Sequence, residues 1–428
     1  MKSKEVIIVN GNNTLTGSVE VSGAKNSALK LIAASILGNG KSTITNVPDI
    51  SDIHIICKVL QQLGAIVEFQ NNTVSIDTST IDKFQTDYEL VSKMRASIAV
   101  LGPLLARFGK AKVALPGGCR IGARKIDMHL IGLKNLGVEF KVEYGYLIGN
   151  VKKHLNHSVI SLEFPSVGAT ENILMAACVA KGTTIIYNAA CEPEIKDLAN
   201  MLNLMGAKIK GAGSNTIIIE GVDVDKMHPC TYKTCPDRIE AGTFLIGGAL
   251  SSGPLSVCNI SREYLNSTIL KLKSMGLDID CTSNSITISR NKNKKLNAID
   301  IQTLPHPGFP TDLQAQIMLL CTQAYGVSVI TENVFENRFM FAEEIKRMGA
   351  NVTLKGHRAY VEGPVILSGA PVYSTDLRAG ASLVLAGIIA NGQTIVRNIG
   401  HIDRGYENFC YKLKKLGADV CRKRIDNK

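Results

Sequence analysis

One short pattern, an apolar residue followed by glycine and a second apolar residue, recurs six times at the end of amphipathic segments. The six glycines are Gly64, Gly137, Gly206, Gly276, Gly349 and Gly417. Successive glycines lie 68 to 73 residues apart, so six units of about 70 residues account for nearly all of the 428-residue chain. A repeat of this length indicates one supersecondary unit that packs against copies of itself.

Each unit shows the same succession of helix and strand signals. The glycine follows a helical pattern and precedes a segment of alternating polarity, which is typical of a helix C-cap that leads into a strand. The strands that follow are expected to pair as hairpins, with turns at 71–72, 143–145 and 213–215. Upstream of the glycine lie another helix and a strand, and helices of this kind are predicted at 26–37 and 171–180. The unit is therefore predicted to be helix, strand, helix and a pair of strands.

The segment 379–390 is apolar nearly all round, which indicates a helix that is enclosed on every side. Enclosed helices do not suit a one-dimensional solenoid. We therefore expect an α/β fold of two domains, each made of three units with buried helices. A break is predicted at 223–235. One domain is expected at 24–232, and the other is expected to combine 1–23 with 233–428.

Composition narrows the classes of partner. The formal net charge of +11 favours anionic partners. Aromatic residues make up 5% and Trp is absent, which disfavours nucleic acid relative to a small phosphorylated metabolite. Eleven cysteines without a C-x-x-C pair, and eight histidines without an H-E-x-x-H motif, argue against a metal site and a disulfide framework. No long apolar run and no signal peptide are recognised, so we expect a cytoplasmic protein with no membrane segment.

The segment 115–124 presents Cys119 in a glycine-rich turn beside Arg120 and Arg124. Neighbouring guanidinium groups favour a thiolate over a thiol, which is the setting of a reactive cysteine. The alternative is a buried, inert cysteine in a hairpin, because free cysteines are usually buried.

Charged residues also recur in loops at equivalent positions of the repeats. Arginines at predicted helix starts, such as Arg238 and Arg378, oppose the helix dipole, which favours a site that binds anions. Solvated helix caps are the alternative, since Asp or Asn at a helix start is routine.

Several of these loops carry motifs that together resemble one known family. They are Val21–Ala28, Leu115–Arg124, Ser166–Thr170, Phe309–Asp312, Phe335–Arg338 and His401–Tyr406. The chain resembles, from about Ile7 to Val420, the bacterial enolpyruvyl transferases that act on UDP-N-acetylglucosamine. The resemblance implies two domains, each of three βαβαββ units with buried helices, which is called an inside-out α/β barrel. It also implies transfer of the enolpyruvyl group from phosphoenolpyruvate to the sugar 3′-hydroxyl, with release of phosphate and without a cofactor or metal, as the first committed step of peptidoglycan synthesis.

The resemblance implies roles for individual residues. Asp312 matches the base toward the sugar hydroxyl, and Cys119 matches a proton donor or an aid to product release that fosfomycin alkylates. Lys25, Arg124 and Arg404 match the cations around phosphoenolpyruvate, and Lys25 is counted with the catalytic residues. The other expected substrate contacts are Asn26, Arg95, Lys125, Ile126, Asp127, His129, Val167, Gly168, Glu192, Val334, Arg338, Asp376 and Arg378.

The sequence departs from many relatives at two places in the expected uridine pocket. Lys125 stands where Pro is common, and Phe164-Pro165 precedes the Ser166 motif where some relatives have Lys. Three other functions remain as alternatives. They are a shikimate-directed transferase of the same fold, a basic RNA-binding repeat protein, and a paralogue that binds substrates without turnover.

Overall fold

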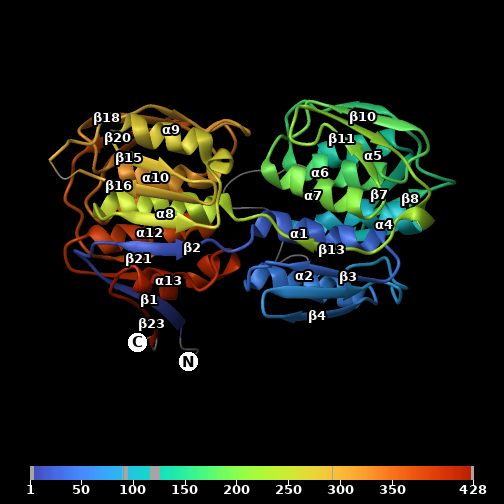
Figure 1. Ribbon diagram of the computed structural model, residues 1–428, viewed down its shortest axis with the longest axis horizontal. Helices are drawn as coiled ribbons and strands as arrows, with labels where there is room; N and C mark the ends of the chain where they lie inside the picture. Colours follow the sequence, from blue (N-terminus) through green and yellow to red (C-terminus); the bar gives the residue numbers. More distant parts are fainter. Residues whose placement is uncertain (1–3, 89, 91–94, 116–125, 292, 426–428) are drawn as a thin grey trace. The chain divides into compact units, whose positions relative to one another are not determined.

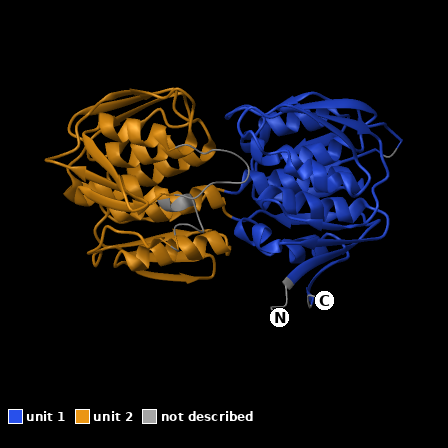
Figure 2. Cartoon of the chain, turned by 180° about the vertical axis from the view of Figure 1, so that it is seen from behind, with its two compact units in different colours: residues 1–22, 119–123, 236–428 blue, residues 23–118, 124–235 orange. Residues whose placement is uncertain are grey.

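A computed structural model describes residues 4–88, 90, 95–115, 126–291 and 293–425. The chain forms two compact units, which are coloured separately in Figure 2. Among the described residues, unit 1 contains 4–22 and 236–425, and unit 2 contains 23–115 and 126–235. Each unit encloses its own cluster of buried apolar side chains, and no residue belongs to both clusters.

Unit 2 contains the first three repeats. The first has α1 (Lys25–Ala34), η1 (Ser35–Leu37), β3 (Lys41–Thr45), α2 (Ser51–Gln62), β4 (Ile66–Gln70) and β5 (Thr73–Asp77). The second has η2 (Arg95–Val100), α4 (Leu101–Phe108), β6 (Lys110–Ala114), α5 (Asp127–Asn135), β7 (Val138–Glu143) and β8 (Tyr146–Val151). The third has β9 (Val159–Ser161), α6 (Val167–Ala177), β10 (Thr183–Tyr187), α7 (Pro193–Leu204), β11 (Lys208–Lys210) and β12 (Thr216–Glu220), followed by η3 (Val224–Lys226) and β13 (Thr231–Lys233).

Unit 1 begins with β1 (Lys4–Asn10) and β2 (Gly17–Glu20) and continues after residue 235. The fourth repeat has α8 (Arg238–Ser251), β14 (Leu255–Cys258), η4 (Arg262–Leu265), α9 (Asn266–Ser274), β15 (Asp278–Cys281) and β16 (Ser285–Ser289). The fifth has β17 (Ile301–Gln302), η5 (Thr311–Leu313), α10 (Gln314–Cys321), β18 (Gly326–Thr331), α11 (Met340–Lys346), β19 (Asn351–Lys355) and β20 (Arg358–Gly363). The sixth has β21 (Pro371–Tyr373), α12 (Leu377–Ile389), β22 (Gln393–Arg397), η6 (Ile399–Arg404), α13 (Phe409–Lys415) and β23 (Val420–Ile425).

The described strands form six small sheets, and none of these sheets closes into a barrel. In five of these six sheets, the strand that follows the buried helix pairs antiparallel with one strand and parallel with another, as in β11-β12-β10-β9, whereas the β6-β8-β7 sheet is antiparallel throughout. Three sheets take a strand from a distant part of the chain. β13 pairs with β3, β2 pairs with β14, and β1 lies between β22 and β23. The N-terminal strands therefore belong to unit 1.

Three helices of unit 1, α8, α10 and α12, are enclosed within the unit, as Figure 1 shows. Every residue of α8 and of α10 is buried. The prediction of an enclosed helix at 379–390 is confirmed, because α12 is buried from Arg378 to Ile388. The α/β fold of six repeats with buried helices is thus the fold of the chain.

The six repeated glycines end helices as predicted. All have positive φ, between 93° and 106°, which favours glycine because a Cβ would meet the preceding carbonyl. The turn at 71–72 is also confirmed, with both asparagines left-handed between β4 and β5. The helix predicted to begin at Glu171 was placed too late. It begins at Val167, because the Ser166 hydroxyl accepts a hydrogen bond from the Ala169 N–H and caps the helix there.

Candidate active site

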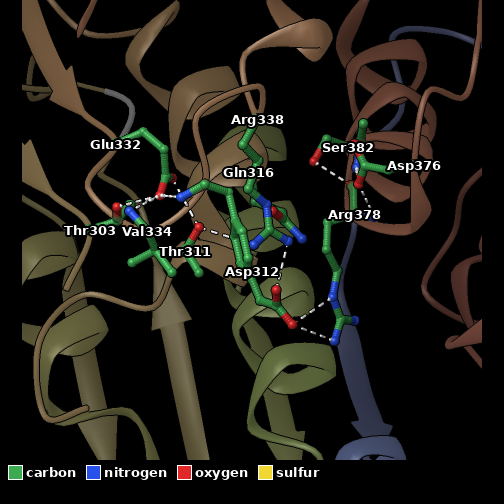
Figure 3. A network of polar contacts seen from close by, with 12 residues as sticks. Thr303, Thr311, Asp312, Gln316, Glu332, Val334, Arg338, Asp376, Arg378 and Ser382 are labelled. Carbon is green, nitrogen blue, oxygen red and sulfur yellow. Dashed lines mark hydrogen bonds and ion pairs between the residues drawn. The ribbon is translucent and has the colours of Figure 1, made fainter. Parts of the chain in front are cut away.

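Asp312 lies in η5, and its carboxylate is held by two arginines (Figure 3). Arg338 Nη2 donates to Oδ1 over 2.6 Å, and Arg378 donates to Oδ2 from Nε at 3.3 Å and from Nη2 at 3.1 Å. The arginine side chains are 5% and 3% exposed, whereas the Asp312 side chain is 26% exposed. Three predicted residues therefore lie together, and the carboxylate is the member that solvent reaches.

A second carboxylate, that of Glu332, holds the loop that carries Val334 (Figure 3). Thr303 and Thr311 donate their hydroxyls to its two oxygens at 2.8 and 2.9 Å, and the Val334 N–H donates at 2.8 Å. Arg338 Nη1 in turn donates to Thr311 Oγ1 at 3.0 Å. The backbone of Val334, a predicted substrate contact, is thus fixed to the same network that holds the arginine.

Arg378 also lies over the ring of Tyr406, with Cζ 5.2 Å from the ring centre. Burial lowers the pKa of Arg378, but the Tyr406 hydroxyl and the charges of Asp312 and Asp237 outweigh this effect and leave the pKa raised. Burial raises the pKa of Tyr406, although Arg378 opposes the shift. Arg378 is therefore a permanent cation beside a neutral phenol, whose oxygen lies 2.9 Å from Thr243 Oγ1.

Two acidic residues of the repeated loops are helix caps. Asp376 Oδ1 accepts from the N–H groups of Arg378 and Ala379 at 2.8 and 3.1 Å, at the start of α12. Asp237 caps α8 in the same way, with bonds of 2.8 and 3.0 Å. The cap interpretation is right for these acids. It does not extend to Arg238 and Arg378, because both are buried instead of solvated.

Arg404 is half-buried at the end of η6. The residue before it, Asp403, accepts two hydrogen bonds from the guanidinium of Arg422, one of them 3.2 Å long. Since Arg422 belongs to β23, this ion pair anchors the short helix that carries Arg404 to the edge of a sheet.

Lys25 and Asn26 form the first turn of α1 in unit 2. Lys25 is buried, and its Nζ lies 2.8 Å from Oδ2 of Asp52, which is 1% exposed. Asn26 is exposed. The next residue, Ser27, donates its hydroxyl to the buried carboxylate of Asp197 at 2.5 Å. The start of α1 is thus held by two buried carboxylates. The Lys25 cation is paired with one of them, because an unpaired charge in the protein interior costs free energy.

The expected uridine-pocket residues lie at the starts of two neighbouring helices of unit 2. Ile126 precedes α5, Asp127 is its exposed first residue, and His129 follows two residues later with 7% exposure. Val167 and Gly168 are the first two residues of α6 and are half-buried. Helix N-termini carry unpaired N–H groups and favour anions, which suits a nucleotide.

Glu192 occupies the cap position of α7 and is buried. Near it, Glu171 of α6 is 1% exposed and forms an ion pair with Lys30 of α1. Burial raises the pKa of Glu171, Lys30 lowers it, and the charges of Glu194 and Glu192 raise it further. Glu192 therefore belongs to a buried acidic group in the interior of unit 2.

Three predicted residues, Cys119, Arg124 and Lys125, lie outside the described residues, and so does the side chain of Arg95. Within the described ranges, no group of three His, Cys, Asp or Glu side chains is placed to hold a metal ion. A pocket of about 620 Å³ in unit 2 is lined mainly by 82–87 and 110–112, and it contains none of the predicted residues. Over the same described part of the chain, no helix has both the length and the apolar character needed to cross a membrane.

Several residues of these networks were missed from the sequence. Glu332, Thr303 and Asp52 received no role, and Tyr406 was noted only as part of a motif. A carboxylate directly after a strand, such as Glu332 after β18, is a usable signal, because strand ends commonly carry site residues. No pattern in the sequence indicates Thr303, since it is 29 residues from its partner.

Comparison with known proteins identifies the class of this fold and site. Residues 9–413 match the EPSP synthase (3-phosphoshikimate 1-carboxyvinyltransferase) family. The crystal structure of the enolpyruvyl transferase NikO from Streptomyces tendae superposes with a TM-score of 0.90 at 27% identity, covering 99% of this chain and all of that one. An EPSP synthase structure from Acinetobacter baumannii, 20% identical and covering 98% of this chain and 100% of that chain, shares the fold with a TM-score of 0.75.

Closer relatives specify the branch. A UDP-N-acetylglucosamine 1-carboxyvinyltransferase of Halothermothrix orenii is 50% identical over 96% of this chain and 98% of its own length. UDP-N-acetylglucosamine 1-carboxyvinyltransferase 1 of Staphylococcus epidermidis is 50% identical over 97% of this chain and 99% of its own. The chain belongs to the enolpyruvyl transferase family and, within it, to the UDP-N-acetylglucosamine 1-carboxyvinyltransferases.

Proposed function

We propose that the protein transfers the enolpyruvyl group of phosphoenolpyruvate to the 3′-hydroxyl of UDP-N-acetylglucosamine and releases phosphate, in the cytoplasm, as the first committed step of peptidoglycan synthesis. The observation that carries this proposal is the carboxylate of Asp312, which is accessible to solvent and oriented by two buried arginines. The names of relatives that are 50% identical over nearly the full length support the substrate pair.

The chemistry requires a proton to leave the sugar hydroxyl while its oxygen forms a bond to C2 of phosphoenolpyruvate. The methylene carbon takes up a proton in the same addition and becomes a methyl group, and loss of phosphate together with one methyl proton restores the double bond. Asp312 accepts the hydroxyl proton, and Cys119 serves as proton donor or in product release. Fixed cations reduce the cost of the charge that develops on phosphate and carboxylate. Lys25, Arg124 and Arg404 have this role.

Other cations and helix N-termini bind the parts of the substrates that do not react. The UDP portion is bound at the starts of α5 and α6 and by the cationic side chain of Arg95. The proposed substrate contacts are Asn26, Arg95, Lys125, Ile126, Asp127, His129, Val167, Gly168, Glu192, Val334, Arg338, Asp376 and Arg378. We assign Asp312 and Arg404 to the catalytic domain of 1–23 and 233–428, and the uridine pocket and the Cys119 loop to the domain of 24–232.

Phosphate release from phosphoenolpyruvate tests the proposal. Purified protein should release phosphate only when UDP-N-acetylglucosamine is added. Shikimate 3-phosphate is the matched acceptor, because the family description names that substrate. Release with shikimate 3-phosphate and none with the UDP-sugar would assign the chain to the other activity.

Fosfomycin tests the cysteine. The antibiotic should add covalently to Cys119 alone, and Cys119→Asp should resist it. Burial raises the pKa values of the Cys57, Cys178 and Cys321 thiols to about 12, so they remain protonated and unreactive at neutral pH. Exposed Cys421 is the internal control, because iodoacetamide should label it while fosfomycin leaves it unmodified. A fosfomycin adduct on any other cysteine, with Cys119 intact, would contradict the assignment.

A further inference from the structure

Asn172 of α6 joins three other helical segments of unit 2 through one side chain. Its Nδ2 donates to the Ile98 carbonyl of η2 at 3.1 Å, and its Oδ1 accepts from the Gly102 N–H of α4 at 2.8 Å. The same Nδ2 lies 3.0 Å from Nδ1 of His129 in α5. The residue itself is 1% exposed. Three of these four segments, η2, α5 and α6, begin at proposed substrate contacts, so Asn172 lies where the nucleotide-binding segments meet.

The orientation of the Asn172 amide is fixed by its backbone partners. A backbone N–H can only donate and a carbonyl can only accept, so the amide oxygen must face Gly102 and the amide nitrogen must face Ile98. That nitrogen therefore presents an N–H to His129 Nδ1. A neutral imidazole has one donor and one acceptor nitrogen, so Nδ1 is the acceptor and the ring proton lies on Nε2.

The protonated edge of the His129 ring lies against the first turn of α6. A Cβ built on Gly168 would lie 3.1 Å from Nε2 and 3.0 Å from Cε1. The position therefore suits glycine, since a side chain there would displace the ring. The Nε2–H donor of His129 consequently lies next to the N–H groups of the first turn of α6.

We propose that Asn172 is a positioning residue that holds His129 as the Nε2–H tautomer, so that the ring donates a hydrogen bond to an oxygen of the UDP portion. The inference rests on the proposed function, because that function places His129 at the nucleotide. A site built around a donor loses affinity when its tautomer is wrong, since the ligand oxygen then faces a lone pair. Asn172 thereby contributes to selection of the nucleotide without touching it.

Asn172→Asp is the sharpest variant, because a carboxylate has nearly the same shape. One oxygen still accepts from Gly102, but the other presents a lone pair to His129 and stabilises a proton on Nδ1. Long-range ¹H–¹⁵N NMR of the histidine rings reports the tautomer, with His129 assigned by its loss in His129→Gln. We expect the Nε2–H tautomer in the parent protein and the Nδ1–H tautomer in Asn172→Asp. The variant should also raise the KM for UDP-N-acetylglucosamine about tenfold or more, while the KM for phosphoenolpyruvate changes by less than about twofold.

Asn203 provides the matched control. Its amide also holds a backbone N–H and a carbonyl, both of Ile209, at 2.8 and 3.0 Å, but it lies near the end of α7. Asn203→Asp should leave the His129 tautomer and both KM values unchanged. His129→Gln retains an N–H near the position of Nε2 and should keep part of the affinity that His129→Leu loses, which tests the donor even where Asn172→Asp folds poorly.

Two results would overturn the proposal. One is an unchanged Nε2–H tautomer in Asn172→Asp, and the other is an equal rise of both KM values with a lowered melting temperature, which marks a purely structural residue. Ligand titrations locate the acceptor, since UDP should shift the His129 Nε2 signal and N-acetylglucosamine 1-phosphate should not. If the parent protein releases no phosphate with UDP-N-acetylglucosamine, the proposed function fails, whereas the tautomer experiment still decides the role of Asn172.

Discussion

Asp312 in unit 1 and Asn172 in unit 2 each tie several elements together, but by different chemistry. Asp312 accepts hydrogen bonds from two buried cations and keeps a quarter of its side chain exposed. Asn172 is neutral, almost fully buried, and bonded mainly to backbone groups. The difference agrees with the roles proposed for the two residues, in which the charged group meets the substrate and the neutral group orients a neighbour that does.

Asp312→Asn should have the largest effect, because the carboxylate is the proposed base and also holds two arginines. Loss of a positioned base lowers kcat by about 10²–10⁴-fold. The two guanidinium groups also lose their anionic partner, which lowers the free energy of unfolding by about 2 kcal/mol, less than for a fully buried pair because Asp312 is partly solvated. Phosphate release and urea unfolding measure the two effects separately.

Asp278→Asn is the control for Asp312→Asn, since Asp278 is an exposed carboxylate on β15 of the same unit. It should change kcat by less than about twofold. If Asp312→Asn lost stability but kept its kcat, the carboxylate would have a structural role only. Asp312 would then resemble Asn172 in acting through its neighbours and not on the substrate.

Lys30→Met should have an intermediate effect on stability in unit 2. It removes the partner of Glu171, which adjoins Asn172 in α6, and should lower the free energy of unfolding by about 3 kcal/mol at neutral pH. The pKa of Glu171 is already raised by burial, and loss of Lys30 raises it further. A carboxyl whose pKa is raised in the folded state destabilises the protein once it ionises, so the free energy of unfolding falls as the pH rises from its ordinary pKa through its folded-state pKa. The variant should therefore be least destabilised at about pH 4.5, where Glu171 is still protonated.

Urea unfolding of Lys30→Met and the parent protein from pH 4.5 to 8 measures this dependence. Lys152→Met is the matched control, because its partner Glu139 is exposed and the pair should contribute little. An equal destabilisation at both ends of the pH range would show that Glu171 does not respond to Lys30.

The smallest effects compare equivalent glycines of the two units. An alanine at position 276 would have to adopt the positive φ of Gly276, which costs roughly 1 kcal/mol. Its Cβ would cause no clash, because the nearest atom is the Lys295 carbonyl oxygen at 3.6 Å. At Gly64 the Cβ would also lie 2.7 Å from the Thr80 carbonyl. Gly64→Ala should therefore lower the urea midpoint more than Gly276→Ala does, and equal midpoints would contradict the close approach.

The repeat made much of the fold predictable, because helix ends and hairpin turns depend on local backbone geometry. The glycines and the turn at 71–72 depend on positive φ, and their spacing alone reveals six units. The exact start of α6 was not predictable in this way, since it depends on whether the Ser166 hydroxyl turns back to cap the helix.

The site was less accessible to sequence reasoning. The grouping of Asp312 with Arg338 and Arg378 came from the family resemblance, because residues 26 and 66 positions away meet Asp312 only through packing of the repeats. Asn172 gave no signal, since a single amide in an apolar helix is equally expected in a buried core. Its role follows from the three partners that tertiary structure places around it.

The position of β1 between β22 and β23 has a consequence for synthesis on the ribosome. All strands of unit 2 lie between residues 23 and 235, so its sheets can form while the remainder of the chain is still being made. β1 precedes both of its neighbours and has the two of them only after about 415 more residues, which takes about 20 to 80 s at ordinary elongation rates. During that interval β1 is an apolar segment without the two strands that it pairs with in the folded unit, so the sheet that contains it is completed last.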